Sequence, residues 1–508
     1  MARISDGARF GRSAAQGSSG ADATFEPMSS AAHASGQRAA RDIVMQVVVR
    51  IGNLALGVVV TALVARMLGR AGYGQWSTIF VVLMLVGYIA NFGLETVAVR
   101  EAARDPDREH EWIGAVILLR MLVMVPAIAV SIAAIVALHE SHEMLVAGLI
   151  LVITMPFNGV GALRLVFQLR VNNLVPMLVI TLRSILWTVA VAVIFWRGGG
   201  MIALAIALSA TSAIGSIVQT VAAIKLADRR PRPSRALLKP LIRESLPIGI
   251  SGLLIVAYAR IDQLIVFEMV GSAPAGLYSS VYNLLEQAQF VPISILTTLA
   301  PVFATSWPDN RDRLLRTVRR ASELMATASF GALAFAAVAA TPLVRLFFGH
   351  AFLAAAPALP VLGGAFVFIC FGYLNDNLLL VLGLQRRRML IGLIALVVNV
   401  AGNLILVPLV GFIGAAWMTL ATEVVVLAMS VRLILGHLQM PLPRPGRVGR
   451  ALLAAVLLTG GMLIVAELNR SLVALTITAC VCYPLLLLGL RAMSLADVRA
   501  VLGRSPLP

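Results

Sequence analysis

Charged residues are scarce in this sequence. Of 508 residues, 13% are charged and 59% are hydrophobic, and the mean hydropathy is +0.92. A soluble domain carries about 25% charged residues, so this chain has too little polar surface to cover the roughly two to four soluble domains that its length would suggest. The apolar residues fall in long runs separated by short polar gaps, which is typical of a protein that crosses a membrane many times.

Lysine and cysteine are also scarce. The two lysines, Lys225 and Lys239, do not follow glycine, so the Gly-Lys step of a phosphate-binding P-loop is missing and we expect no ATPase site of that kind. The three cysteines lie in apolar runs, so we expect no disulfide framework. His139 and His142 lack the HExxH spacing that places two histidines on one helix face, and we expect no metal and no cofactor.

The apolar runs predict an all-α protein with fourteen membrane spans. Most runs reach the roughly 20 residues that cross a ~30 Å hydrocarbon core. The predicted spans are 43–65, 76–98, 113–138, 144–163, 174–196, 201–224, 246–268, 276–300, 323–344, 354–382, 389–407, 413–435, 451–466 and 472–490.

Basic residues alternate between the gaps. Of 41 Lys and Arg residues, 31 lie in gaps on the same side as the amino terminus, five lie in the opposite gaps and five lie inside spans. Lys and Arg concentrate in cytoplasmic loops, so we expect both termini in the cytoplasm. The net charge of +17 is then mainly a signal of topology, and we expect no nucleic-acid partner.

An internal repeat relates two parts of the chain. Met67-Leu68-Gly69 recurs 202 residues later as Met269-Val270-Gly271. The same offset pairs Gly74 with Gly276, Trp76 with Tyr278, and Ser77 with Ser279. Parallel repeats are a transporter architecture with the substrate site at the repeat interface. We therefore expect two pseudo-symmetric six-helix bundles around a central cavity, plus two extra helices; the alternative is that small residues recur at helix ends by chance.

The predicted organisation has five parts. They are a disordered cytoplasmic tail at 1–42, a first bundle at 43–224, a basic cytoplasmic linker at 225–245, a second bundle at 246–435, and appended helices 13 and 14 with the C-terminal tail at 436–508.

Several of these segments resemble a known family. Leu68–Gly74, Asn91–Glu95 and Arg100–Arg104 resemble the first helix pair of Wzx-type oligosaccharide flippases. Tyr258–Gln263 and Gly276–Ser279 resemble the seventh helix of that family and its following turn. The family belongs to the multidrug/oligosaccharidyl-lipid/polysaccharide exporter superfamily, which also holds multidrug and toxin extruders and lipid II flippases.

The resemblance implies a transporter and not an enzyme. Its cargo would be a polyprenyl-pyrophosphate-linked oligosaccharide, flipped from the inner to the outer leaflet by alternating access for polysaccharide export. The implied location is the bacterial inner membrane, with the lipid bilayer, a polysaccharide polymerase and glycosyltransferases as further partners.

Four arginines inside the predicted spans are candidates to bind the pyrophosphate. They are Arg50, Arg120, Arg183 and Arg260. A charge at the bilayer centre costs roughly 2.5–3.5 kcal/mol, and the planar guanidinium grips phosphate through paired donors. The alternatives are that Arg50 and Arg120 snorkel to the inner headgroups, and that Arg260 forms a static ion pair with an acid on another helix.

Four acids in the second half are candidates to couple transport to H⁺ or Na⁺. They are Asp262, Glu286, Asp376 and Glu423. Asp262 is the first choice because it shares a span with Arg260 but faces another side of the helix. The alternative is that these acids are static hydrogen-bonded groups.

Two other functions remain open. A cation-coupled small-molecule exporter of the same superfamily would have the same layout, although interior arginines disfavour cationic cargo. A membrane enzyme of polysaccharide assembly would need a sizeable outer loop, whereas the outer gaps here hold at most about ten residues.

Overall fold

The computed structural model describes residues 29–160, 164–170, 174–226, 231–438, 446–469 and 471–493, and within these all regular structure is helical. The elements are α1 (Ser29–Asn91), α2 (Leu94–Arg104), η1 (Pro106–Arg108), α3 (Glu109–Leu138), α4 (His142–Val152), α5 (Thr154–Val160), α6 (Arg164–Leu169), α7 (Leu174–Trp196), α8 (Met201–Leu226), η3 (Arg235–Leu237), α9 (Leu238–Val270), α10 (Ser272–Ala288), α11 (Phe290–Ser306), α12 (Arg311–Phe348), η4 (His350–Ala355), α13 (Ala358–Val381), α14 (Gln385–Val410), α15 (Phe412–Leu438), α16 (Gly446–Leu468) and α17 (Leu472–Gly489).

The chain divides into two compact units, residues 1–52 and 53–508. In the first unit, α1 begins at Ser29, whereas the sequence predicted a disordered tail up to residue 42. The segment from Ser29 is rich in alanine, which has the highest helix propensity, and this favours the helix. The predicted second bundle and all of the predicted first bundle except residues 43–52 fall in the second unit, so the boundary between the bundles stays a prediction.

Twelve helices in the described part of the chain are long and apolar enough to cross a membrane. The first, Gly52–Arg104, covers the span predicted at 76–98 and residues 52–65 of the span predicted at 43–65, and Gly69 kinks α1 between them with a φ of 67°. The span predicted at 144–163 is a shorter apolar segment, His142–Phe157, which is broken between α4 and α5 just before Pro156. The number fourteen therefore stays a prediction, while the multi-pass membrane character is clear.

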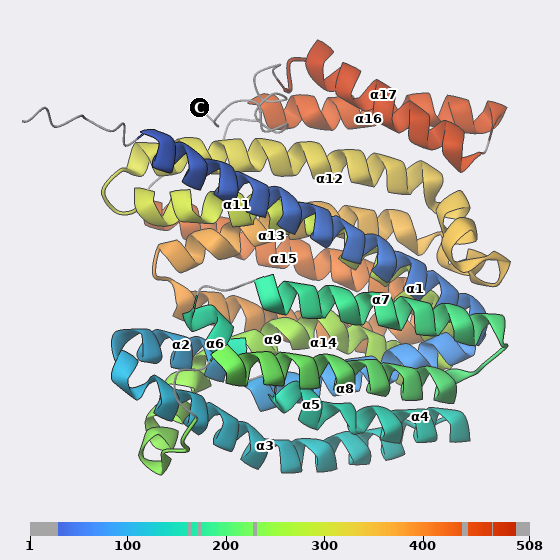
Figure 1. Ribbon diagram of the computed structural model, residues 1–508. Helices are drawn as coiled ribbons and strands as arrows, with labels where there is room; N and C mark the ends of the chain where they lie inside the picture. The colour runs from blue at the N-terminus through green and yellow to red at the C-terminus, as the bar shows by residue number, and fades with distance from the viewer. Residues whose placement is uncertain are drawn as a thin grey trace, which may run out of the picture. The chain divides into compact units, whose positions relative to one another are not determined.

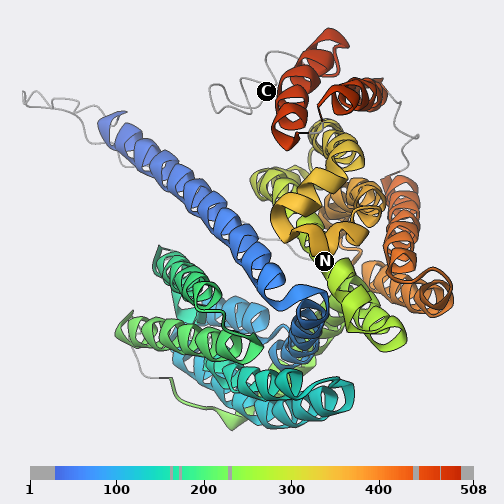
Figure 2. The ribbon, with the colours of Figure 1, turned by 90° about the vertical axis from the view of Figure 1, so that its right-hand side faces the viewer.

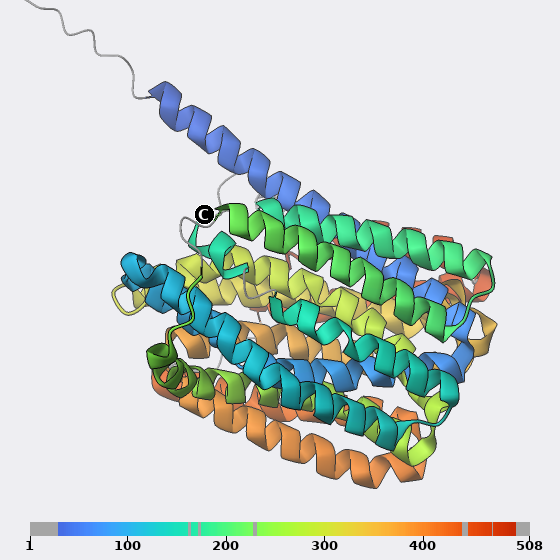
Figure 3. The same cartoon turned by 60° about the horizontal axis from the view of Figure 1, so that its bottom comes forward.

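The links between helices in residues 53–508 sort to two ends of the molecule (Figures 1 and 3). The arginine-rich end, on the left of Figure 1, holds the starts of α3, α7, α12 and α16. The opposite end holds the starts of α4, α8 and α17. This sorting matches the alternation of basic residues between successive gaps. Large apolar side chains face outward along the helices, as at Val125 and Leu409, which are 71% and 72% exposed.

Two groups of helices make up this second unit (Figure 2). Helices α3–α8 lie in one group, and α11–α17 lie in the other. The appended pair, α16 and α17, packs on α12 of the second group. The Tyr483 hydroxyl on α17 donates a hydrogen bond of 2.7 Å to the Thr327 carbonyl of α12, which ties the pair to the bundle.

The two copies of the sequence repeat meet each other. A Cβ atom added at Gly74 would overlap the Ser272 carbonyl, and one added at Gly276 would overlap the Arg70 carbonyl. Beside them, the Ser77 hydroxyl donates to the Ser279 hydroxyl at 2.9 Å. Residues related by the 202-residue offset therefore lie in direct contact, between the second part of α1 and α10.

The linker between the halves is shorter than the predicted 225–245. Helix α8 extends to Leu226 and α9 already begins at Leu238. The link packs on α3, because the Arg232 amide donates to the His110 carbonyl at 3.1 Å and Gly114 leaves room for the Arg232 backbone. Pro231 and Pro233 keep this short stretch out of the helix, and the apolar residues that follow resume it.

Candidate functional site: two cavities and a buried carboxylate

A cavity of about 650 Å³ lies within the first half of the second unit. Residues of α1, α2, α3, α5, α7 and α8 line it, and we call it the first-half cavity. Its walls carry hydrogen-bonding side chains beside the arginines and one acid: Tyr88, Asn91, Glu95, Thr96, Arg120, Thr154, Arg183, Ser212, Ser216 and Gln219. A polar interior of this kind suits a ligand with many hydroxyl or phosphate oxygens.

Arg120 and Arg183 enter this cavity from different helices. Arg120 on α3 is 3% exposed, and its guanidinium donates to the Glu95 carboxylate at 2.8 Å. Arg183 on α7 lays its stem against Gly215 of α8. Among the residues that the structure describes, Arg183 has no acid within ion-pair distance, whereas the charge of Arg120 is matched by Glu95. The described residues that line this cavity therefore carry one net positive charge, which Arg183 supplies.

A second cavity, of about 420 Å³, lies where the two halves of the repeat meet. We call it the interface cavity, since α1, α7 and α8 line one side and α9 and α10 line the other. Met84 lines both cavities, so they are neighbours. Arg260 of α9 faces the interface cavity, where its guanidinium pairs with Glu286 of α10 and lies 5.4 Å from the centre of the Tyr282 ring. The structure therefore contains an ion pair between Arg260 and an acid on another helix.

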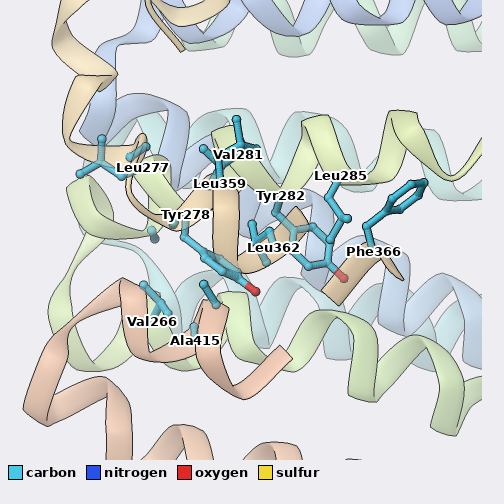
Figure 4. Close-up of a cluster of buried hydrophobic side chains, with 14 of the residues drawn as sticks. Val266, Leu277, Tyr278, Val281, Tyr282, Leu285, Leu359, Leu362, Phe366 and Ala415 are labelled. Atoms are coloured by element: carbon cyan, nitrogen blue, oxygen red, sulfur yellow. The ribbon is translucent and has the colours of Figure 1, made fainter. Parts of the chain in front are cut away.

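Asp262 lies in a buried polar network at the core of the second half. Asp262 is 2% exposed. Its carboxylate accepts hydrogen bonds from the Tyr278 hydroxyl, from the backbone amide of Gln263 at 2.8 Å and from the Thr419 hydroxyl at 3.2 Å. The side-chain amide of Gln263 donates to the Ser279 hydroxyl, which also accepts from the Ser77 hydroxyl. Figure 4 shows the Tyr278 and Tyr282 rings among apolar side chains that exclude water from this region. The network connects the carboxylate directly to the contact between the repeats.

The remaining predicted acids lie apart from Asp262. Glu286 is the partner of Arg260, and both oxygens of Asp376 accept from Arg388, at 3.0 and 2.8 Å. Glu423 on α15 is 8% exposed and makes no hydrogen bond within the described part of the chain. Of the four acids, Asp262 is thus the one that is buried and accepts several hydrogen bonds within the described residues.

The sequence located the charges but not their partners. Arg120 and Arg183 share one cavity, Arg260 lines the other, and the side chain of Arg50 lies outside the described residues. The repeat had already marked Tyr278 and Ser279. Nothing in the sequence marked Thr419 or the pairing of Glu95 with Arg120, because these contacts join distant segments.

Three solved structures that resemble this chain are transporters. The lipid II flippase MurJ in an inward closed conformation superposes with a TM-score of 0.72 at 13% identity, covering 90% of this chain and 99% of that one. A MATE multidrug resistance transporter of the MOP superfamily gives TM-scores of 0.64 inward-facing and 0.56 outward-facing, at 17% and 16% identity. The two MATE matches cover 76% and 78% of this chain, and 95% and 94% of those chains.

No curated protein matches the chain. The chain is a multi-pass membrane protein with the fold of MOP-superfamily transporters.

The family follows from the sequence. The profile of the polysaccharide biosynthesis protein family matches residues 39–307, more than half of the chain. The chain belongs to the polysaccharide biosynthesis protein family.

The Arg260–Glu286 pair can be tested by a double-mutant cycle. We expect Arg260→Gln and Glu286→Gln each to lower the thermal stability of the detergent-purified protein, because each leaves a partly buried charge without its partner. The double variant should lose less than the sum of the two, with a coupling energy of about 1–2 kcal/mol. Additive losses would show that the pair contributes nothing to folding.

Proposed function

We propose that this protein is a flippase that moves a polyprenyl-pyrophosphate-linked oligosaccharide from the inner to the outer leaflet of the bacterial inner membrane by alternating access. Membership of the polysaccharide biosynthesis protein family and the fold shared with the lipid II flippase MurJ support this proposal. The observation that carries it is the first-half cavity, where Arg183 faces an enclosure rich in hydrogen-bonding side chains.

The charge of the cavity favours an anionic cargo. A pyrophosphate is a dense anion, and arginine binds it through two parallel hydrogen bonds that a lysine cannot reproduce. Sugar hydroxyls can bond to the amide and hydroxyl groups that line the same cavity. Arg120 is held by Glu95, so we assign Arg183 the direct contact with phosphate and Arg120 the shaping of the cavity wall.

A cation-coupled drug exporter is the second candidate, because the MATE transporter shares the fold. Cationic drugs would need acidic groups free to receive them, and the only acid lining the first-half cavity among the described residues is Glu95, which is already paired with Arg120. An enzyme of polysaccharide assembly is less well supported, since the links at the end opposite the arginine-rich end are short, as between α9 and α10 and between α14 and α15.

We further propose that the carboxylate of Asp262 couples transport to H⁺ or Na⁺. It contacts α10 and α15 at once, and its network reaches the contact between Ser77 and Ser279. A change in the charge of Asp262 would therefore alter the hydrogen bonds that hold the two repeats together. Glu286 and Asp376 would act as structural partners of Arg260 and Arg388. Neither a cofactor nor a nucleotide is part of this proposal.

The cell biology follows from the same proposal. We infer that the arginine-rich end faces the cytoplasm, because basic residues concentrate in cytoplasmic loops, and that both termini are cytoplasmic, as the distribution of basic residues in the sequence predicts. Glycosyltransferases would supply the lipid-linked oligosaccharide at the inner leaflet, and a polysaccharide polymerase would consume it at the outer leaflet.

Arg183 gives the most direct test of the cargo. We expect Arg183→Ala to lower polysaccharide export by at least about tenfold, since a charge-assisted hydrogen bond contributes about 1.5–3 kcal/mol. Arg183→Lys should restore only part of the export. The lysine ammonium is a point charge, whereas the planar guanidinium group of arginine presents paired N–H donors to phosphate. The measurement is polymer export in cells whose own copy of the gene has been deleted, with membrane levels of each variant measured in parallel.

The matched control is Arg197→Ala, which removes an exposed arginine beyond the far end of α7. Export by Arg183→Ala at the level of this control would contradict the assignment.

Ion coupling is tested in proteoliposomes. We expect flipping of the lipid-linked oligosaccharide by the wild type to respond to a pH or Na⁺ gradient, and Asp262→Asn to remove the response while the protein stays folded. The control is Glu268→Gln, which neutralises an exposed acid on the same helix. Flipping by the wild type that is independent of both gradients would contradict ion coupling. It would show instead that transport is passive and runs down the gradient of the lipid-linked oligosaccharide.

A further inference from the structure

A third cavity, of about 760 Å³, lies at the arginine-rich end and belongs to neither site described above. We call it the arginine pocket. Helices α11, α12 and α16 surround it, and Figure 1 shows their ends side by side. Its lining residues are Thr298, Leu299, Val302, Arg313, Arg316, Thr317, Arg319, Arg320, Glu323 and Arg447. The two parts of the chain that contribute arginines, α12 and α16, are far apart in sequence.

The arginine pocket is rich in positive charge. Five arginines and one acid, Glu323, are among the described residues that line it. The Glu323 carboxylate accepts from Arg319 at 3.2 Å and from Arg447 at 3.1 Å. Arg313 and Arg316 belong to the same lining, so several like charges are brought together in one cavity. An anion bound among them would reduce their mutual repulsion.

The position of these arginines on α12 adds to the unfavourable charge. Arg313, Arg316 and Arg320 are spaced by three and four residues, so they share one face of the helix, where like charges destabilise it. Arg313 also lies in the first turn of α12, near the positive end of the helix dipole, where anions are favoured and cations are not. A bound anion would reverse each of these effects.

Membrane topology alone does not account for the arrangement. The positive-inside preference requires basic residues in the loops, but it does not require them to converge on one cavity from two separate helices. The 38 residues of α12 span about 57 Å, well beyond a ~30 Å hydrocarbon core, so its arginine-rich first turns reach the headgroup layer.

Part of the wall of the arginine pocket is apolar. Leu299 and Val302 of α11 form this part, and the hydroxyl-bearing Thr298 and Thr317 also line the pocket. An inorganic anion would make no use of such a wall, whereas a lipid could place its phosphate among the arginines and its first methylene groups against Leu299 and Val302. Basic pockets between membrane helices at this depth bind anionic lipid headgroups in other proteins.

The geometry points to a lipid-phosphate site in the arginine pocket, separate from the translocation cavities. Its ligand is a phosphate-bearing lipid headgroup, supplied either by an anionic phospholipid of the bilayer or by a polyprenyl diphosphate. The site does not depend on the cargo proposed above, since it shares no residue with the first-half or the interface cavity.

The experiment measures lipid binding to the detergent-purified full-length protein by native mass spectrometry. The probes are dioleoyl phosphatidylglycerol, undecaprenyl diphosphate, zwitterionic dioleoyl phosphatidylcholine and inorganic pyrophosphate. We expect the wild type to bind at least one of the two anionic lipids more tightly than phosphatidylcholine. Arg313→Gln/Arg316→Gln should weaken that binding by about tenfold, because each basic residue near the headgroups contributes to the attraction.

The matched control is Arg386→Gln/Arg387→Gln, which removes two exposed charges from α14 outside the pocket and should leave binding unchanged. Preference for phosphatidylglycerol would identify the bilayer as the source of the ligand, and preference for undecaprenyl diphosphate would identify a polyprenyl carrier. Equal loss in both double variants, or no preference over phosphatidylcholine, would overturn the proposal. Binding of inorganic pyrophosphate as tight as that of the lipids would overturn it as well, because the apolar wall would then play no part.

Discussion

The contact between Gly74 and Gly276 determines how the two repeats fit together. Neither position has room for a side chain, because each glycine faces a backbone carbonyl from the other repeat. In a membrane, helices gain little from the hydrophobic effect among themselves, so close backbone packing and interhelical hydrogen bonds hold them. Ser77 and Ser279 add such a bond directly beside the glycines. The closed contact at this end of the bundle therefore depends on four small residues related by one offset.

The arginines inside the bundle differ in whether a carboxylate pairs with them. Arg120, Arg260 and Arg388 each donate to a carboxylate on the same half of the molecule. The attraction within each pair offsets part of the cost of removing two charges from water. Arg183 differs, since within the described residues no acid lies within ion-pair distance of it. This difference is the reason that the flippase proposal assigns the phosphate contact to Arg183.

Much of the architecture was predictable from the sequence, since membrane helices must satisfy their backbone internally and basic residues mark one side. The repeat also marked Gly74 and Gly276, because identical small residues recur there at one offset. The partners of the charges were not predictable. Glu95 lies in a stretch that looks interfacial, yet it reaches Arg120 on the next helix. Thr419 is an unremarkable polar residue until folding places α15 against Asp262. The arginine pocket likewise needs α16 beside α12, a contact between segments over a hundred residues apart.

Alternating access requires the contact between the repeats to open and close during transport. The most direct measurement joins Ser77→Cys to Ser279→Cys in a protein whose three native cysteines are replaced by serine, reconstituted with a fluorescent lipid-linked oligosaccharide in proteoliposomes. The two serine hydroxyls are 2.9 Å apart, so oxidation should cross-link the cysteines. We expect flipping to stop on oxidation and to resume on reduction, while the single-cysteine variants continue throughout. Flipping at the wild-type rate by the cross-linked protein would contradict the account.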